Sequence, residues 1–415
     1  DRIRSKLLCG YAGFSRPGGK SALTSMDLSR VVESTRHRIG ALLQPITNKS
    51  HPMKMMTYLN PRSARRRFTR PLFTFLAFSL AIGAACADPV DRRDVFDRMA
   101  ATGVPGVAIA IVRNGTVDVE SLGSASPDAD IPVTANTTFE AASLSKTVFA
   151  TMFMEAVADE QFTVDEPLAP TRASQRVTND AWYGQLTPRL ILSHQSGLPN
   201  WAGDAGKPDR TDPLEFNLEP GAAFGYSGEG YELLHAHVTA ALNMSLEDWL
   251  DAHRQSYGME ASHYAFDVAP STAAIAAGDS PKSTRAIKPS PYSLAAASLV
   301  TTANDYGRFL RYLLANPDLL ASLATAQVIV EEGAEGTLSW GLGWGIFERP
   351  DGSRIAYHWG DNWQFKSFVA IDLASQTGIV YFANGVEGLR LIDTIVEPVT
   401  GDLGMVRDWL GYEDD

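Results

Sequence analysis

Apolar positions recur at the strand period near both ends of the region that starts at residue 88. Residues 107–112 are an unbroken apolar run, and an Arg-Asn-Gly turn joins them to a second short strand at 116–121. Near the C-terminus the same pattern predicts four more strands, at 341–347, 354–358, 365–373 and 378–383. Strands at both ends, with helices between them, predict one antiparallel sheet built from both chain ends.

Helical periodicity dominates between these strands. The predicted helices span residues 91–101, 143–159, 187–194, 230–242, 245–254, 302–315 and 389–396. Thr187 before Pro188, and Ser245 with two acidic residues in the following turn, are typical of helix N-termini. We therefore expect an α/β (α+β) fold, in which sheet parts at about 88–150 and 296–415 are flanked by helices and a helical subdomain at about 151–295 is inserted.

The sequence before residue 88 has the layout of an export signal. A basic stretch from Arg62 to Arg70 precedes an uncharged segment at 71–87, which ends in a small-x-small cleavage pattern, Ala85-Cys86-Ala87. The segment is slightly short for a membrane span of about 20 residues, but a short membrane anchor is the alternative. Arginines before Phe68 resemble a twin-arginine signal, and Cys86 could instead be a lipidation site.

Methionines at positions 53, 55 and 56 stand just before this signal, whereas residues 1–52 begin without one. We therefore expect an unassigned upstream segment at 1–52, an export signal at 53–87 and a folded region at 88–415, whose length suits one large domain or two intimate ones. The expected location is periplasmic or secreted, with lipid anchoring at Cys86 as a further form.

The regions before and after residue 88 also differ in net charge. Residues 1–87 hold 15 basic and 3 acidic side chains, whereas residues 88–415 hold 21 basic and 45 acidic ones. An acidic body of this kind repels phosphate backbones, so no nucleic-acid partner is expected. Both cysteines, Cys9 and Cys86, precede residue 88, so the domain has no disulfide, no thiol nucleophile and no cysteine-ligated metal.

The strongest chemical signal is Ser143-Leu144-Ser145-Lys146 at the start of a predicted helix. Ser143 and Lys146 are three residues apart and share a helix face. A serine hydroxyl needs a nearby base to become a nucleophile, and a lysine can be that base if burial or a positive field lowers its pKa. Ser145 does not fit this geometry and is expected to serve local structure.

Two further segments contain candidate residues. Tyr226 follows a Gly-rich turn and could carry a second proton, or it could be a loop aromatic that packs on the core. His358, Trp359 and Gly360 end a predicted strand, where Gly360 would let the backbone approach a substrate; His358 could also be a surface histidine. His235 and His237 lie two apart on a helix and so on different faces, and no metal site is expected.

The ordered set Ser143-x-x-Lys146, Tyr226-Ser227 and His358-x-Gly360 resembles the class C β-lactamase and penicillin-binding serine hydrolase family. That family also includes DD-carboxypeptidases, D-aminopeptidases and family VIII carboxylesterases. Supporting matches lie at residues 192–199, 219–221, 298–305 and 341–345, and the resemblance covers roughly residues 92–400. It implies a β-lactamase/transpeptidase-like fold and an enzyme without a cofactor.

The resemblance also implies roles for individual residues. Ser143 would be the acylated nucleophile, and Lys146 and Tyr226 its proton-transfer partners. The backbone N–H groups of Ser143 and Asp361 would form the oxyanion hole, and His358 would stand where the family has Lys or His. The implied reaction is acylation of Ser143, followed by attack of water on the acyl-enzyme.

Two positions depart from the family pattern. Gly228 stands where the tyrosine motif usually ends in Asn, so the amide is missing unless Glu229 or a water replaces it. Trp359 stands where the strand motif usually has Thr, which removes a hydroxyl and adds apolar surface. Both changes reduce polar recognition of an anionic substrate.

We therefore expect an exported serine hydrolase that acts on a small-molecule or peptide ester or amide. A β-lactamase or DD-carboxypeptidase is the alternative within the family, and a non-catalytic penicillin-binding protein is the more distant one. The intact Ser143, Lys146 and Tyr226 argue against the last of these. The substrate-binding residues are expected to be His358, Trp359, Gly360 and Gly228.

Overall fold

The structure is a computed structural model that describes residues 90–126, 131–203, 210–264 and 293–412. The predicted upstream segment and export signal, with both cysteines, lie outside the described residues, as do Lys207, Lys282 and Lys288. Within the described ranges, none of the helices has both the length and the apolar character needed to cross a bilayer.

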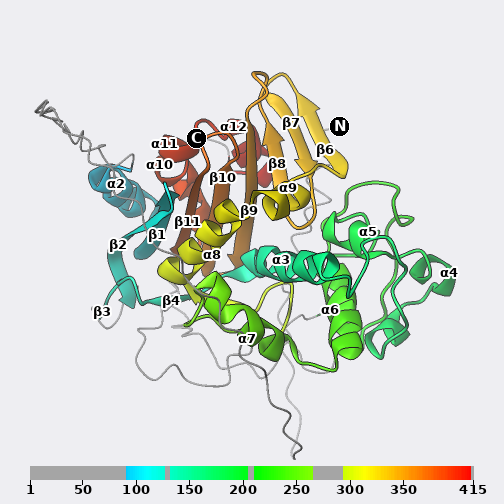
Figure 1. Cartoon of the computed structure of the whole chain (residues 1–415). Coiled ribbons are helices and arrows are strands. Elements are labelled where there is room, and N and C mark those ends of the chain that lie inside the picture. Colours follow the sequence, from blue (N-terminus) through cyan, green and yellow to red (C-terminus); the bar gives the residue numbers. More distant parts are fainter. Residues whose placement is uncertain (1–89, 127–130, 204–209, 265–292, 413–415) are drawn as a thin grey trace, which may run out of the picture. The chain divides into compact units, whose positions relative to one another are not determined.

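A nine-stranded antiparallel sheet is the central feature of the domain (Figure 1). Its strands are β1 (Gly106–Arg113), β2 (Thr116–Ser126), β3 (Ile131–Pro132), β6 (Val328–Gly333), β7 (Gly336–Trp340), β8 (Gly345–Glu348), β9 (Arg354–Asn362), β10 (Phe365–Asp372) and β11 (Thr377–Ala383). Their order in space is β3-β2-β1-β11-β10-β9-β8-β7-β6. Because β1 pairs with β11, the two ends of the domain share one sheet, and the predicted fold class is confirmed.

Each face of this sheet has its own apolar core. Odd-numbered residues of β1 from Val107 to Ile111 belong to one core, and even-numbered residues from Ala108 to Val112 belong to the other. The first core includes α2 (Arg92–Thr102), α10 (Ile392–Ile395) and α12 (Gly404–Leu410), and the second includes α3 (Ser145–Ala158) and α8 (Ala303–Ala315). Figure 1 shows α8 and α3 along the front of the sheet. The candidate serine therefore lies on the α3 side.

A helical region between β4 (Thr138–Glu140) and β5 (Val300–Thr302) extends from this second face (Figure 1). It contains α4 (Asp180–Tyr183), α5 (Pro188–Leu192), α6 (Gly228–Leu242) and α7 (Leu246–Tyr257). The predicted caps are present: Thr187 accepts from Leu190 N, and Ser245 accepts from Asp248 N. Ser227 caps α6 in the same way and so fixes the helix directly after Tyr226.

The strands differ from the sequence prediction in several places: β3, β4, β5, β6 and β7 were not predicted, and β2 and β9 continue beyond their predicted ends. The hairpin of β6 and β7 was not predicted, because its edge strand is largely exposed and lacks a continuous apolar run. The strand predicted at 341–347 begins only at Gly345. Gly343 has a φ of 88°, which belongs to a turn and not to a strand.

Candidate active site

Ser143 lies in a short 3₁₀ turn, η1 (Ala142–Leu144), that leads directly into α3. The backbone before it is held from two sides: Ala141 N donates to Leu299 O at 2.8 Å, and Ser367 Oγ donates to Ala141 O at 2.8 Å. Ala142 has a φ of 50°, in the left-handed region that residues other than glycine rarely adopt. Backbone strain is therefore concentrated at the residue before the candidate nucleophile.

Gly360 allows β9 to touch this turn. A Cβ at position 360 would lie 2.2 Å from Ser367 Oγ and 2.5 Å from Ala141 O, which no real side chain tolerates. The absence of a side chain thus places the backbone of β9, including Asp361, beside η1. The Asp361 side chain pairs with Lys366 at the start of β10, which fixes the hairpin that carries the Asp361 N–H.

Lys146 is completely buried in the first turn of α3. Its Nζ lies 3.0 Å from Ser143 Oγ and 2.8 Å from the carbonyl oxygen of Ala296. Burial lowers the pKa of Lys146 to about 7, although the nearby Glu232 acts in the opposite direction. A large fraction of this amine is therefore unprotonated at neutral pH and can accept the serine proton.

Tyr226 is half-buried beside this amine, with its ring centroid 4.9 Å from Lys146 Nζ. His194 holds the backbone on both sides of the tyrosine: its carbonyl accepts from Gly225 N at 2.7 Å, and its Nδ1 accepts from Ser227 N at 3.1 Å. Burial lowers the pKa of His194 well below its usual value, which keeps Nδ1 free of a proton and able to accept. Tyr226 therefore lies in a loop, as one alternative expected, and its ring also lies beside the candidate base.

His358 and Trp359 form an uncharged, aromatic side of the site. His358 is buried, not a surface residue, and burial lowers its pKa to about 3, so the ring is neutral. The Trp359 ring centroid lies 5.1 Å from that of Tyr226 and 5.1 Å from that of Trp409 on α12. Trp340 on β7 packs against the same group, 5.9 Å from Trp359. These side chains offer apolar surface but no positive charge.

Gly228 is the first residue of α6, and its surroundings leave no room for a side chain. A Cβ there would lie 2.8 Å from a ring carbon of Trp201 and 2.9 Å from the carbonyl oxygen of Asn200. Gly228 N also donates to Asn200 Oδ1 at 3.0 Å. The missing asparagine of the family motif therefore could not be restored without moving Trp201 and Asn200.

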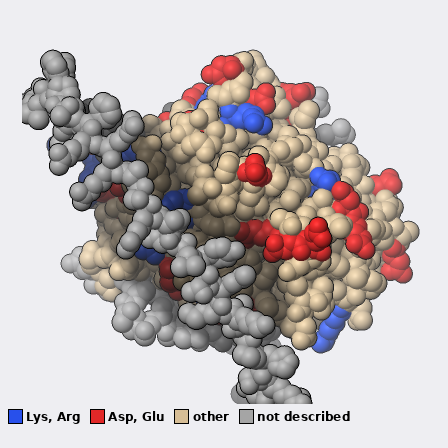
Figure 2. Space-filling model, in the orientation of Figure 1, with Lys and Arg blue, Asp and Glu red and all other residues tan. Residues whose placement is uncertain are grey.

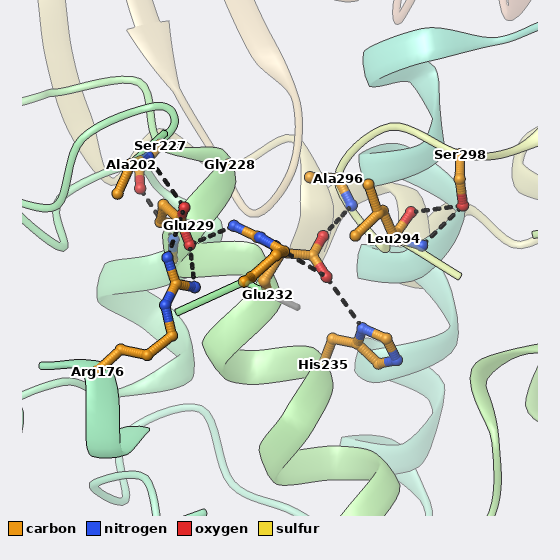
Figure 3. A network of polar contacts seen from close by, with 12 residues as sticks. Arg176, Ala202, Ser227, Gly228, Glu229, Glu232, His235, Leu294, Ala296 and Ser298 are labelled. Atoms are coloured by element: carbon orange, nitrogen blue, oxygen red, sulfur yellow. Dashed lines mark hydrogen bonds and ion pairs between the residues drawn. The ribbon is translucent and has the colours of Figure 1, made fainter. Parts of the chain in front are cut away.

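Glu229 does not take the place of that asparagine. Its buried carboxylate pairs with Arg176 at 3.0 Å and with Arg210, and it accepts from Ala202 N at 3.0 Å. Figure 3 shows it directed toward Arg176 and Ala202. The hypothesis that Glu229 replaces the amide is not supported, because both of its oxygens are already bound.

Three residues near the site carry no signal in the motifs that predicted Ser143 and Lys146. Ala296 accepts from Lys146 Nζ through its carbonyl oxygen, whereas Arg176 and Arg210 pair with Glu229. Glu229 and Glu232 explain the arginines, because both carboxylates are buried in the first turns of α6 and buried carboxylates need cations. Within the described ranges, no three His, Cys, Asp or Glu side chains are grouped so as to hold a metal ion.

Several solved structures have a fold similar to that of this chain. The structure superimposes on an octameric penicillin-binding protein homologue from Pyrococcus abyssi with a TM-score of 0.61 and 20% identity, covering 76% of this chain and 79% of the other. A class C beta-lactamase gives a TM-score of 0.61 at 20% identity, with 75% and 96% covered. The D-alanine carboxypeptidase AmpC from Burkholderia cenocepacia gives 0.60 at 20% identity, with 74% and 97% covered. At these identities the likeness concerns the fold.

The sequence itself gives the stronger assignment. Residues 92–395 match the family model described as Beta-lactamase, which is well over half of the chain. The match includes the candidate serine, lysine, tyrosine and strand residues described above. The antiparallel sheet and the 3₁₀ turn that carries Ser143 agree with this match. The chain belongs to the beta-lactamase family.

Proposed function

We propose that this protein is an exported serine hydrolase that cleaves a neutral carboxylic ester or amide through an acyl-enzyme on Ser143. The observation that carries the proposal is the 3.0 Å distance between Lys146 Nζ and Ser143 Oγ. Burial supports the chemistry, because it lowers the pKa of Lys146 to about 7 and so supplies an unprotonated amine at neutral pH. The signal-like segment at 53–87 supports export.

In the first step, the Ser143 hydroxyl proton passes to Lys146 Nζ while Oγ bonds to the substrate carbonyl carbon. The carbonyl electron pair moves onto its oxygen, which the N–H groups of Ser143 and Asp361 stabilise. The bond to the leaving group then breaks, and that group takes a proton delivered through Lys146 and Tyr226. Water then attacks the acyl carbon and gives a proton to the same amine. The bond between the acyl carbon and Ser143 Oγ breaks, and Oγ takes that proton back, which releases the acid and restores both Ser143 and the amine.

The preference for a neutral substrate rests on the chemistry around the site. Trp359 replaces a hydroxyl, Gly228 provides no amide, and His358 is neutral because burial lowers its pKa to about 3. On the face shown in Figure 2, acidic side chains gather in a band, whereas Lys and Arg are scattered. An anionic substrate would approach a repulsive field and find few compensating groups.

A panel of three measurements tests the proposed substrate class: turnover of a chromogenic short-chain ester, turnover of a chromogenic cephalosporin, and intact mass after exposure to penicillin. We expect ester turnover with little cephalosporin turnover. Efficient cephalosporin hydrolysis would overturn the preference and identify a β-lactamase. A stable penicillin adduct, without turnover of either chromogenic substrate, would identify a penicillin-binding protein.

Replacement of Trp359 tests the origin of the preference. We expect Trp359→Thr to raise the ratio of cephalosporin to ester kcat/KM about 10-fold, because a hydroxyl can again bind the lactam carboxylate. Trp359→Ala is the matched control, since it opens the same space without a hydroxyl. If the two variants change the ratio equally, the lost hydroxyl is not what sets the preference.

A further inference from the structure

Helix α6 carries a buried carboxylate whose contacts lead to the candidate base. Glu232 Oε1 accepts a hydrogen bond from Ala296 N at 3.0 Å, and the carbonyl oxygen of the same Ala296 accepts from Lys146 Nζ at 2.8 Å. Figure 3 shows Glu232 directed toward Ala296. Ala296 lies in a turn, outside any helix or strand, so its position depends on contacts of this kind.

Glu232 is itself held firmly. Its second oxygen accepts from His235 Nδ1 at 3.1 Å and lies 3.9 Å from Arg210 Nη1. Arg210 also pairs with Glu229, which in turn binds Arg176 at 3.0 Å. His235 and Arg210 therefore hold the side chain of Glu232, whereas Glu229 and Arg176 extend the partly buried network on the other side of Arg210 without a contact to Glu232. A carboxylate that is itself held in place can fix the turn to which it is hydrogen-bonded, here the turn at Ala296.

Glu232 also supplies the negative charge that acts on Lys146. The other titratable groups near the lysine are His194, which follows α5, His358 on β9, Tyr226, which precedes α6, and Tyr231 in the first turn of α6. Burial lowers the pKa of both histidines and raises the pKa of Tyr231 well above its usual value, so these three are neutral at pH 7. Of the shifts that act on the lysine, only that from Glu232 favours the protonated amine.

We propose that Glu232 is a positioning residue for the proposed reaction: its carboxylate fixes Ala296, whose carbonyl oxygen holds Lys146 Nζ against Ser143 Oγ. The inference rests on the proposed function, because it gives Glu232 a role through the Ser143–Lys146 pair. Its negative charge has a second effect, since it opposes the loss of the lysine proton. Glu232 thus sets both the place of the base and the pH at which it becomes available.

Two substitutions separate these effects. Glu232→Gln keeps the size and an oxygen that can accept from Ala296 N, but it removes the charge. Glu232→Leu removes both the charge and the acceptor. The matched control is Glu229→Gln, which changes a buried carboxylate of the same helix and the same arginine network without a contact to Ala296.

The measurement is the rate at which a fluorophosphonate probe modifies Ser143, followed by intact mass between pH 5 and pH 10. In this reaction Ser143 Oγ bonds to phosphorus, fluoride leaves, and the serine proton passes to Lys146. We expect the midpoint of the pH profile in Glu232→Gln to fall by about 0.5–1 pH unit, because an amine without a nearby anion loses its proton more easily. We expect Glu232→Leu to lower the plateau rate about 10-fold or more.

Glu229→Gln should keep the wild-type midpoint and a plateau rate within about 3-fold of wild type. An unchanged midpoint in folded Glu232→Gln overturns the proposal, even if Glu232→Leu does not fold. So does a plateau rate in Glu232→Leu equal to that of Glu229→Gln. If the wild-type protein is not modified at Ser143 at any pH, the proposed function fails instead, which keeps the two claims distinguishable.

Discussion

Replacing Lys146 by methionine is expected to lower kcat/KM for the ester about 10³-fold and, at pH 6, to make the fold more stable. Activity is lost because the amine 3.0 Å from Ser143 Oγ is the candidate base, and general bases contribute on this scale. Stability rises because methionine fills the same buried space without a charge. Steady-state kinetics and thermal unfolding across pH check the two parts.

The pH dependence of the stability gain follows from the lowered pKa. Below about pH 7 Lys146 is protonated in both the folded and the unfolded chain, and burial of the cation costs the fold most. Between about 7 and 10.5 the folded chain has lost the proton but the unfolded chain still holds it, so wild-type stability rises with pH. The full shift corresponds to about 5 kcal/mol, reduced by about 1–3 kcal/mol for the lost hydrogen bonds. The advantage of the methionine variant should therefore shrink toward pH 10.

Lys146→Arg serves as the comparison for the catalytic part. A guanidinium keeps the positive charge and hydrogen-bond donors, but it does not lose its proton near neutral pH. We expect this variant to be about as inactive as Lys146→Met and less stable than wild type. An arginine variant with more than a tenth of wild-type activity would contradict the assignment of Lys146 as a base.

Gly360→Ala is expected to lower kcat/KM about 10²-fold and to destabilise the fold by about 1–3 kcal/mol. Its Cβ would lie 2.2 Å from Ser367 Oγ and 2.5 Å from Ala141 O, so β9 or the turn before Ser143 must move. Movement of either changes the distance between the Ser143 and Asp361 N–H groups, on which oxyanion stabilisation depends. Urea unfolding and ester kinetics measure both effects.

Gly378→Ala is the matched control, because this glycine also lies on a strand of the sheet. A Cβ there would meet Leu310 at 3.4 Å, an ordinary contact, so little change is expected in stability or activity. Equal behaviour of the two variants would show that the close approach of β9 to η1 does not position the site.

Much of the fold could be predicted from hydrophobic periodicity. The buried run at 107–112 and the strands at 365–373 and 378–383 correspond to β1, β10 and β11, which pair across the domain. The exposed β6 and the β7 beside it escaped prediction, because an edge strand with few buried residues shows little periodicity. The turn at 341–344 was read as a strand, since its alternation of Gly with large apolar residues mimics the strand period.

The residues of the candidate site also differ in how far the local sequence could predict them. Ser143 and Lys146 are three residues apart, so their spacing predicted a shared helix face, and in the structure Lys146 Nζ lies 3.0 Å from Ser143 Oγ. Tyr226 and His358 required the family resemblance, because nothing in their local sequence fixes what they face. The contact from Glu232 through Ala296 to Lys146 joins three distant parts of the chain, and no single segment carries a signal for it.

The most direct test of the acyl-enzyme is the mass of the protein trapped by rapid acid quench during ester turnover. The proposed chemistry requires an increase equal to the acyl group, located by peptide mapping at Ser143 and absent from Ser143→Ala. Ser145→Ala should still form the adduct. Ser145 Oγ donates a hydrogen bond to Ala142 O and accepts one from Leu299 N, so it serves the local backbone and is not the proposed nucleophile. Undiminished ester turnover by Ser143→Ala, or an adduct on another residue, would contradict the proposed chemistry.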